Sequence, residues 1–393
     1  MANGGISVSS ADPDDTGRRA RHRPSALSER WIALRNALLS NQRFQRLALR
    51  FPLTRPIARR RARDAFDLCA GFVYAQILQA MVRLDVFTTL RDGPQPLSAI
   101  AAHHRLACGP LEQLAGAAAA LGLLERLSGD RIALGPLGAA LLANPGALAM
   151  VAHHDRLYSD LEDPVAFLRE RHEPGRLGAF WPYAAGDDPA AIGESEAAGY
   201  SALMAASHAI VTDEIFAAYP VARHRALLDV GGGEAGFAIA AARVAPHLAC
   251  SVFDLPAVAA RARRRIATAG LSERIQAIGG DAFRDPLPAG ADLVTLIRIL
   301  HDHDDEAACA LLTTVRRAIA PDGRLLVAEP MSQWRRGDRI ADAYFGIYLL
   351  AMGSGRPRSA SELSDLLRAA GFVPRRLSGR GAWMSGLLLA RPA

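Results

Sequence analysis

Residues 227–236 read LLDVGGGEAG, an apolar run that leads directly into a glycine-rich turn. The turn matches G-x-G-x-x-G through Gly231, Gly233 and Gly236, and Asp254 ends the next apolar run, 23 residues after Gly231. Glycines let a backbone approach a bound nucleoside, and a carboxylate at the tip of the second strand can accept hydrogen bonds from ribose hydroxyls. The stretch therefore predicts a nucleoside-binding α/β sheet, although the pattern alone fits a nicotinamide cofactor as well as S-adenosylmethionine.

The residues after Arg225 alternate between apolar runs of strand length and helical segments, which is typical of a parallel α/β sheet. The chain closes with two further strand-like runs about a turn apart, which predicts an antiparallel hairpin added to that sheet. The strand candidates are 227–230, 249–253, 275–278, 293–296, 324–328, 372–377 and 383–390.

Three features favour S-adenosylmethionine as the cofactor. Asp229 stands two positions before Gly231, where a carboxylate suits a cationic sulfonium. Asp281 follows the third strand and can reach an adenine amino group while Phe283 packs nearby, and a closing hairpin is the usual end of a methyltransferase sheet. We therefore predict a doubly wound Rossmann-like methyltransferase sheet; the alternative is a glycine-rich turn that binds nothing. The expected cofactor-binding residues are Asp229, Gly231, Gly233, Asp254, Leu255, Asp281, Ala282 and Phe283.

A second group of polar residues, LHDHDDE at 300–306, follows the fourth strand candidate. Active-site residues of open parallel sheets gather at this edge, and His301 can take a proton from a substrate hydroxyl if an acidic partner holds its tautomer. Glu329, at the end of the next strand, is the expected partner. Two other interpretations stay open: a helix N-terminus capped by Asp302, Asp304 and Asp305, and a metal site, which lacks an obvious source of further ligands. We expect no metal.

The chain before the sheet divides into three expected parts. Residues 1–27 form a disordered tail, and residues 28–147 form a helical domain in which 85–142 follow the helix, helix, helix, hairpin order of a winged-helix module. Within it, the run 65–84 is apolar on most faces and is expected to pack against a large partner such as a second subunit. Residues 148–222 form a helical connector, and 223–393 form the catalytic domain.

Composition limits the class of protein. Lys and Arg exceed Asp and Glu by six over 393 residues, but many arginines fall in two N-terminal runs, 18–23 and 55–63. These runs are consistent with ordinary solvated basic faces or with contact to anionic lipid. The four cysteines are far apart and form no C-x-x-C pair, which fits a reducing cytoplasm, and no segment is predicted to cross a membrane.

The motifs L-L-D-V-G-G-G, F-D-L-P, G-D-A-F, R-I-L-H-D-H-D-D and L-V-A-E-P resemble, in order and spacing, those of the O-methyltransferases typified by plant phenylpropanoid and bacterial polyketide enzymes. The resemblance covers nearly the whole chain. It implies that the winged-helix part makes an intertwined homodimer and binds no DNA. It also implies that His301 is the catalytic base, that Glu329 is one of two acidic supports, and that Asp254, Asp281 and Ala282 contact the cofactor.

The sequence departs from this pattern at three places. The Lys that plant members place four residues before the His is Ile297, with Arg298 next to it, and the Trp that follows their His-Asp pair is His303. The second acidic support aligns near Pro357. If the acceptor is a tertiary alcohol, which is much less acidic than a phenol, proton removal is expected to be concerted with methyl transfer.

Residues 51–71 and the sequence GSGRPRS at 353–359 are similar to the carotenoid-specific members from phototrophic bacteria. These enzymes methylate the tertiary 1-hydroxyl of demethylspheroidene or hydroxyneurosporene. The similarity implies an apolar substrate delivered from the photosynthetic membrane, with the enzyme in the cytoplasm or peripheral at the membrane's inner face. Side chains at this helical spacing belong to a hydrophobic core as often as to a substrate pocket. The candidate substrate residues are Tyr200, Met204, Tyr344, Phe345, Tyr348 and Met352.

Two alternative functions remain. The first is an O-methyltransferase of a phenolic or polyketide acceptor. The second is a winged-helix, ligand-sensing DNA binder, which the sequence disfavours because the expected recognition helix, 110–121, carries no Arg or Lys to meet phosphates or bases.

Overall fold

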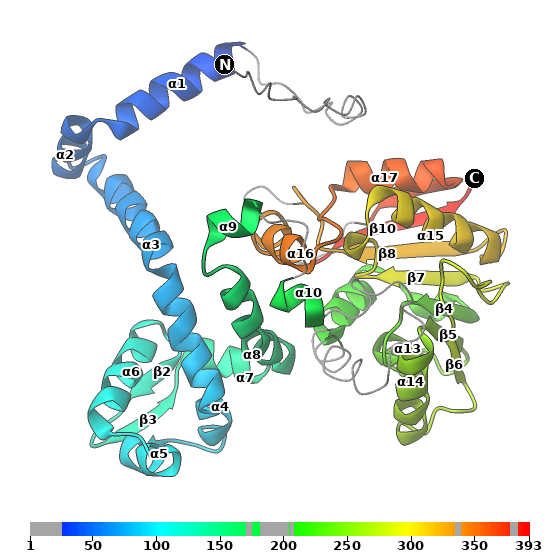
Figure 1. The fold of residues 1–393 in the computed structure, drawn as a ribbon, viewed down its shortest axis with the longest axis horizontal. Helices are drawn as coiled ribbons and strands as arrows, with labels where there is room; N and C mark the ends of the chain where they lie inside the picture. Colours follow the sequence, from blue (N-terminus) through cyan, green and yellow to red (C-terminus); the bar gives the residue numbers. More distant parts are fainter. Residues whose placement is uncertain (1–25, 170–174, 181–203, 205–207, 335–338, 378–383) are drawn as a thin grey trace, which may run out of the picture. The chain divides into compact units, whose positions relative to one another are not determined.

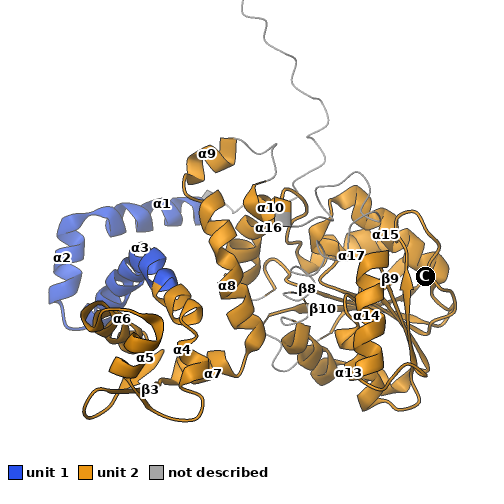
Figure 2. Cartoon of the chain, turned by 60° about the horizontal axis from the view of Figure 1, so that its bottom comes forward, with its two compact units in different colours: residues 1–76 blue, residues 77–393 orange. Residues whose placement is uncertain are grey.

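A computed structural model describes residues 26–169, 175–180, 204, 208–334, 339–377 and 384–393. Of the expected tail, residues 1–27, only the last two residues lie within these ranges. Tyr200 lies outside them. The chain divides into two compact units, Met1–Gln76 and Ile77–Ala393 (Figure 2). The domain boundaries expected from the sequence differ from this division and stay a prediction.

The described part of the first unit is helical. It contains α1 (Ala26–Ser40), α2 (Gln42–Arg50) and most of α3 (Arg55–Arg83). Asn41 starts α2, because its side chain accepts hydrogen bonds from the backbone N–H groups of Arg43 and Phe44 at 2.9 and 3.2 Å. No residue of α2 is buried.

By length and composition alone, helix α3 is long and apolar enough to cross a membrane. A helix in a protein core or interface passes the same test. Its final turns belong to the second unit, where Met81 is only 1% exposed within an apolar cluster. Earlier in the helix, Phe66, Leu68 and Phe72 are 65–82% exposed. These side chains fit the expectation that the run 65–84 packs against a second subunit.

The second unit begins with helices and strands in the predicted winged-helix order. The winged-helix part contains a three-stranded sheet of order β1-β3-β2. The predicted hairpin is present, since β2 and β3 pair antiparallel. Helices α7, α8, α9 and α10 follow these strands. The elements are α4 (Val86–Thr89), β1 (Gln95–Pro96), α5 (Leu97–His104), α6 (Cys108–Ala120), β2 (Leu124–Arg126), β3 (Arg131–Leu134), α7 (Pro136–Leu142), α8 (Pro145–Asp160), α9 (Pro164–Arg169) and α10 (Arg176–Phe180).

The remainder of the second unit is built on a seven-stranded sheet of order β6-β5-β4-β7-β8-β10-β9 (Figure 1). Five strands are parallel, and β10 is antiparallel to both β8 and β9, as the closing hairpin predicted. The strands are β4 (Ala226–Val230), β5 (Ala249–Asp254), β6 (Ile275–Gly279), β7 (Leu293–Ile297), β8 (Arg324–Glu329), β9 (Phe372–Arg376) and β10 (Gly386–Pro392).

Helices cover both faces of this sheet and create two apolar layers. Helices α13 (Gly236–Val244) and α14 (Pro256–Thr268) pack on one face, and α15 (Asp305–Ala318) and α17 (Ala360–Ala369) pack on the other. Parallel strands that are buried on both faces consist almost entirely of apolar residues, and for this reason the sequence predicts β7 and β8 as apolar runs. The arrangement gathers the carboxyl ends of β4, β5, β6 and β7 at one edge, where the polar motifs lie.

Candidate active site

The glycine-rich turn follows β4 and has a conformation that glycine adopts most readily. Gly231 and Gly233 have φ angles of +68° and +57°. A Cβ at Gly231 would overlap the side chain of Ile299, whereas one at Gly233 would meet no atom within 4 Å. The turn therefore packs tightly at its start and leaves open space at Gly233.

Asp254 joins this turn to the tip of β5. Its Oδ2 accepts a hydrogen bond from the Gly233 N–H at 2.8 Å, and its Oδ1 accepts one from the Leu255 N–H at 2.8 Å. Burial raises the pKa of Asp254 to about 6, although the two backbone hydrogen bonds act in the opposite direction. The carboxylate is thus fixed in position by the backbone of both elements.

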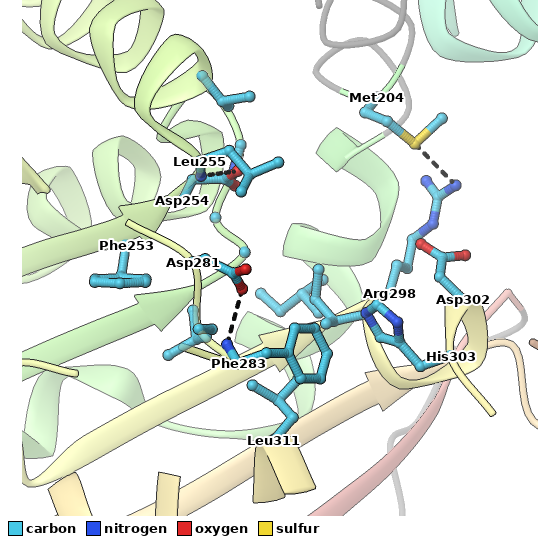
Figure 3. A pocket seen from close by; sticks show the side chains of 18 of the residues that line it. Met204, Phe253, Asp254, Leu255, Asp281, Phe283, Arg298, Asp302, His303 and Leu311 are labelled. Atoms are coloured by element: carbon cyan, nitrogen blue, oxygen red, sulfur yellow. Dashed lines mark hydrogen bonds between the residues drawn. The ribbon is translucent and has the colours of Figure 1, made fainter. Parts of the chain in front are cut away.

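A cavity of about 370 Å³ opens above the turn and extends to the residues after β7 (Figure 3). Two groups of its lining residues face each other in the close-up, with Asp254 and Asp281 on one side and Arg298, Asp302 and His303 on the other. The predicted cofactor residues that line it are Gly231, Gly233, Asp254, Leu255, Asp281, Ala282 and Phe283.

Asp229 is the exception among the predicted cofactor residues, because it does not line this cavity. It is 1% exposed and lies behind the turn, where a Cβ on Gly232 would touch its carboxylate. Thr295 of β7 donates a hydrogen bond to its Oδ1 at 2.6 Å, and burial raises the pKa of Asp229 to about 7. The structure places this carboxylate as a support of the turn.

His301 lies on a short 3-10 turn between β7 and α15 and is enclosed by two carboxylates. Its Nδ1 is 2.5 Å from Glu329 Oε2, and its Nε2 is 3.1 Å from Asp302 Oδ1. Glu329 is itself fixed, since its Oε1 accepts the backbone N–H groups of Ile299 and Leu300 at 3.0 and 2.8 Å. Burial acts to lower the pKa of His301, but Asp302 and Glu329 outweigh it and raise the pKa above its usual value.

Asp302 is the member of this group that lines the cavity, whereas His301 and Glu329 do not line it. Burial also raises the pKa of Asp302. The sequence comparison placed a second acidic support near Pro357, and the structure instead provides a carboxylate next to His301 in the chain. From the sequence, Asp302 was expected only to favour the helix N-terminus or to belong to a metal site, and its contact with His301 was not predicted.

Residues 354–356 hold the backbone of the His301 turn. The Arg356 N–H donates to the carbonyl oxygen of His301 at 2.8 Å, and the Ser354 hydroxyl donates to that of Asp302 at 2.9 Å. Gly355 has a φ of +73°, and a Cβ there would overlap the His301 carbonyl oxygen. The GSGRPRS segment noted in the sequence is therefore packed directly on the turn that carries His301.

Arg358, from the same segment, ties the turn from its buried side. The side chain is 2% exposed and donates to the carbonyl oxygens of Leu300 and His303 at 2.6 and 2.7 Å. It also pairs with Asp305 at 2.8 Å. Nothing in the sequence distinguished this arginine from the exposed ones.

The candidate substrate residues separate into two groups. Met204 and Met352 line the cavity. Phe345 is 7% exposed and places its ring edge-on to that of His301, with 6.0 Å between centroids, while Tyr344 and Tyr348 belong to the same apolar cluster. Sequence reasoning missed His208 and Arg298, which also line the cavity.

The capping interpretation of the acidic cluster is confirmed for Asp304. Its side chain accepts the Ala307 N–H at 2.8 Å and so caps α15. Within the described ranges, no group of three or more His, Cys, Asp or Glu side chains is arranged to hold a metal ion.

Comparison with known proteins identifies the family. Residues 158–373 match the O-methyltransferase domain, and residues 66–144 match the O-methyltransferase dimerisation domain. The chain belongs to the O-methyltransferase family. It is an S-adenosylmethionine-dependent O-methyltransferase, and the dimerisation domain supports a homodimer.

Two bacterial relatives of this O-methyltransferase carry the name demethylspheroidene O-methyltransferase. The protein from Cereibacter sphaeroides is 44% identical over 335 residues, which are 85% of this chain and 88% of the relative. The protein from Rhodobacter capsulatus is 39% identical over 336 residues, 85% and 82% of the two chains. Among solved structures, human N-acetylserotonin methyltransferase in complex with S-adenosylmethionine matches with a TM-score of 0.73 and 27% identity, over 84% of this chain and 97% of that one.

Proposed function

We propose that this enzyme transfers a methyl group from S-adenosylmethionine to the tertiary 1-hydroxyl of an acyclic carotenoid, such as demethylspheroidene or hydroxyneurosporene. The observation that carries the proposal is the similarity to two demethylspheroidene O-methyltransferases along most of all three chains. The apolar side chains of Met204 and Met352 in the cavity wall suit such an acceptor.

The residues of the cavity fit S-adenosylmethionine, which supplies an electrophilic methyl group on a positively charged sulfur. The Asp254 carboxylate, fixed by two backbone N–H groups, is suited to accept ribose hydroxyls. The open space at Gly233 lets a ligand approach the backbone, and Asp281 with Phe283 is suited to adenine. Asp229 contributes by supporting the turn from behind.

His301, Glu329 and Asp302 are proposed to manage the acceptor proton. The acceptor hydroxyl would pass its proton to this group as its oxygen takes the methyl group and the sulfur–carbon bond of the donor breaks, releasing S-adenosylhomocysteine; the two carboxylates would stabilise the resulting imidazolium. Asp302 borders the cavity and orients the hydroxyl, while Glu329 fixes the Nδ1–H tautomer. Proton removal concerted with methyl transfer avoids a free tertiary alkoxide, and positioning supplies much of the rate.

We also propose that the helical domain 28–147 forms the dimer, that the connector 148–222 contributes to the substrate pocket, and that residues 223–393 bind the cofactor. A polyene acceptor partitions into bilayers, so the enzyme is expected in the cytoplasm, at the inner face of the membrane that holds its substrate.

The deciding experiment incubates the purified protein with methyl-labelled S-adenosylmethionine and a 1-hydroxycarotenoid, in parallel with phenolic and polyketide acceptors. We expect a labelled carotenoid methyl ether. Transfer only to phenols or polyketides would overturn the carotenoid assignment and leave the O-methyltransferase assignment intact.

The roles within the site are tested by His301→Ala and by Asp302→Asn, a nearly isosteric change. Methyl transfer should collapse in the first and fall in the second, while the affinity for S-adenosylhomocysteine stays within about twofold of wild type, because neither residue is assigned to the cofactor. Full turnover by His301→Ala would show that orientation alone suffices.

A further inference from the structure

The first helix of the chain carries an apolar stripe that faces solvent. Leu27, Trp31, Leu34 and Leu38 recur at intervals of four, three and four residues and so share one face of α1. They are 78%, 64%, 55% and 44% exposed. Single exposed apolar residues are ordinary, but a continuous stripe that includes a tryptophan indicates a surface that contacts something else.

Arginines border this stripe along α1. At 100° per residue, Arg30 projects on one side of the stripe and Arg35 on the other. Residues 26–63, which we name the N-terminal arm, contain ten arginines and a single acidic residue, Glu29. Within the described ranges, no arginine of the arm forms a salt bridge with a carboxylate.

The same combination of exposed apolar and basic residues continues through the rest of the arm. Leu47 in α2, Leu53 in the turn that follows and Ile57 in α3 are 64%, 78% and 59% exposed. The run Arg59 to Arg61 with Arg63 follows at once. The arm, drawn within the blue unit of Figure 2, is therefore basic and apolar over its whole length.

Three kinds of partner could cover such a surface, and its chemistry separates them. A second copy of the arm would bring a second set of unpaired arginines against the first, and the match to the dimerisation domain begins only at residue 66. A nucleic acid would meet the arginines but would leave the tryptophan–leucine stripe in water. An anionic bilayer surface satisfies both, because guanidinium groups bind phosphate headgroups while apolar side chains enter the acyl boundary.

We propose that the N-terminal arm binds the surface of a membrane rich in anionic phospholipids, with the stripe on α1 inserted at the headgroup boundary and the arginines paired with lipid phosphates. This inference rests on the proposed location of the enzyme at a membrane. The arm lies on the surface and does not cross the bilayer, since arginines recur along it from Arg30 to Arg63.

The test uses the full-length protein and sedimentation with vesicles. Wild type should bind vesicles of equal parts phosphatidylglycerol and phosphatidylcholine at low salt, bind pure phosphatidylcholine much more weakly, and lose binding at high salt. Replacing Arg59, Arg60, Arg61 and Arg63 with Gln should weaken binding on the order of 100-fold, from about fivefold per arginine with incomplete additivity. Replacing Trp31, Leu34 and Leu38 with Ser should weaken binding at every salt concentration.

The matched control replaces four exposed arginines of the second unit, Arg91, Arg223, Arg243 and Arg317, with Gln, and should bind vesicles as wild type does. Light scattering and methyl transfer to detergent-dispersed carotenoid are measured on every variant, so that failure of the arm and failure of the reaction are separate results. Equal binding by arm and control variants overturns the inference. So does conversion of the arm variants to monomers with vesicle binding intact, or salt-sensitive binding to DNA without binding to vesicles.

Discussion

The substitution Gly355→Ala tests whether the GSGRPRS segment positions the turn that carries His301. Gly355 has a φ of +73°, and an added Cβ would overlap the carbonyl oxygen of His301 and the backbone of Asp302. A left-handed backbone costs a non-glycine residue about 1–2 kcal/mol. Overlap with backbone atoms adds about 1–3 kcal/mol, because neither backbone segment, at Gly355 or at residues 301–302, can relieve it by a side-chain rotation. We expect the free energy of unfolding to fall by about 2–5 kcal/mol.

The same overlap must move the His301 turn or the segment that holds it. A displacement of about 1 Å at a catalytic group can cost on the order of 100-fold in rate. We therefore expect kcat per folded molecule to fall by about 100-fold. The affinity for S-adenosylhomocysteine should change little, since Gly355 does not line the cofactor cavity.

Gly270→Ala is the matched control, because Gly270 has a φ of +69° and an added Cβ would meet no atom within 4 Å. It should lose only the backbone cost, about 1–2 kcal/mol, and keep full kcat. Urea unfolding gives the stabilities, and initial rates with labelled cofactor give kcat. Equal losses of stability in the two variants, with full activity in both, would refute the assigned role of the segment.

Three further predictions concern polar groups in and around the site. The pKa of Asp254 near 6 predicts that affinity for S-adenosylhomocysteine weakens by up to about tenfold per pH unit below 6, as the carboxylate gains a proton; Asp254→Asn should bind weakly at every pH in calorimetry. The pKa of Asp229 is raised to about 7, so the folded state holds this proton to a higher pH than the unfolded chain does, and the stability of the wild-type protein should fall as pH rises toward 7. Thr295→Val removes a hydrogen-bond donor to the charged carboxylate, so it should lower the free energy of unfolding by about 1–3 kcal/mol above pH 7 and by less below pH 7. A loss of stability that does not change with pH would contradict this. Arg358→Met removes the side-chain donor to the His303 carbonyl oxygen and leaves the Leu300 carbonyl oxygen with only the longer bond from the His303 N–H at 3.4 Å, so denaturation should show a loss of about 1–3 kcal/mol, and wild-type stability would disprove the role.

The sheet was predictable from the sequence because its signals are local. Strands such as β4 and β7 are buried on both faces and appear as apolar runs, and the Gly231 turn has a backbone requirement that few other residues satisfy. The order of these runs, together with the closing hairpin, was enough to predict the cofactor edge and to place His301 on it.

The details of the site depended on contacts between distant residues, and these were not predictable. Asp302 and Asp304 look alike in the sequence, yet one side chain faces His301 Nε2 and the other caps α15. Asp229 was expected among the cofactor contacts, but the packing of Gly232 against it puts its carboxylate behind the turn. The sequence does not separate Arg358 from the other arginines, and only the structure shows that its side chain is buried, with 2% exposed.

The chain order around α16 (Gly346–Met352) restricts how this enzyme can acquire new acceptors. Met352 lines the cavity at the end of this helix, and the segment that holds the His301 turn begins two residues later at Ser354. A substitution in α16 that reshapes the cavity is therefore expected to displace the turn that carries His301 as well. Met204 is connected to the residues before the turn by a side-chain contact, since Arg298 donates a hydrogen bond to its Sδ at 3.6 Å, whereas changes in α16 are expected to require matching changes in the residues that follow it.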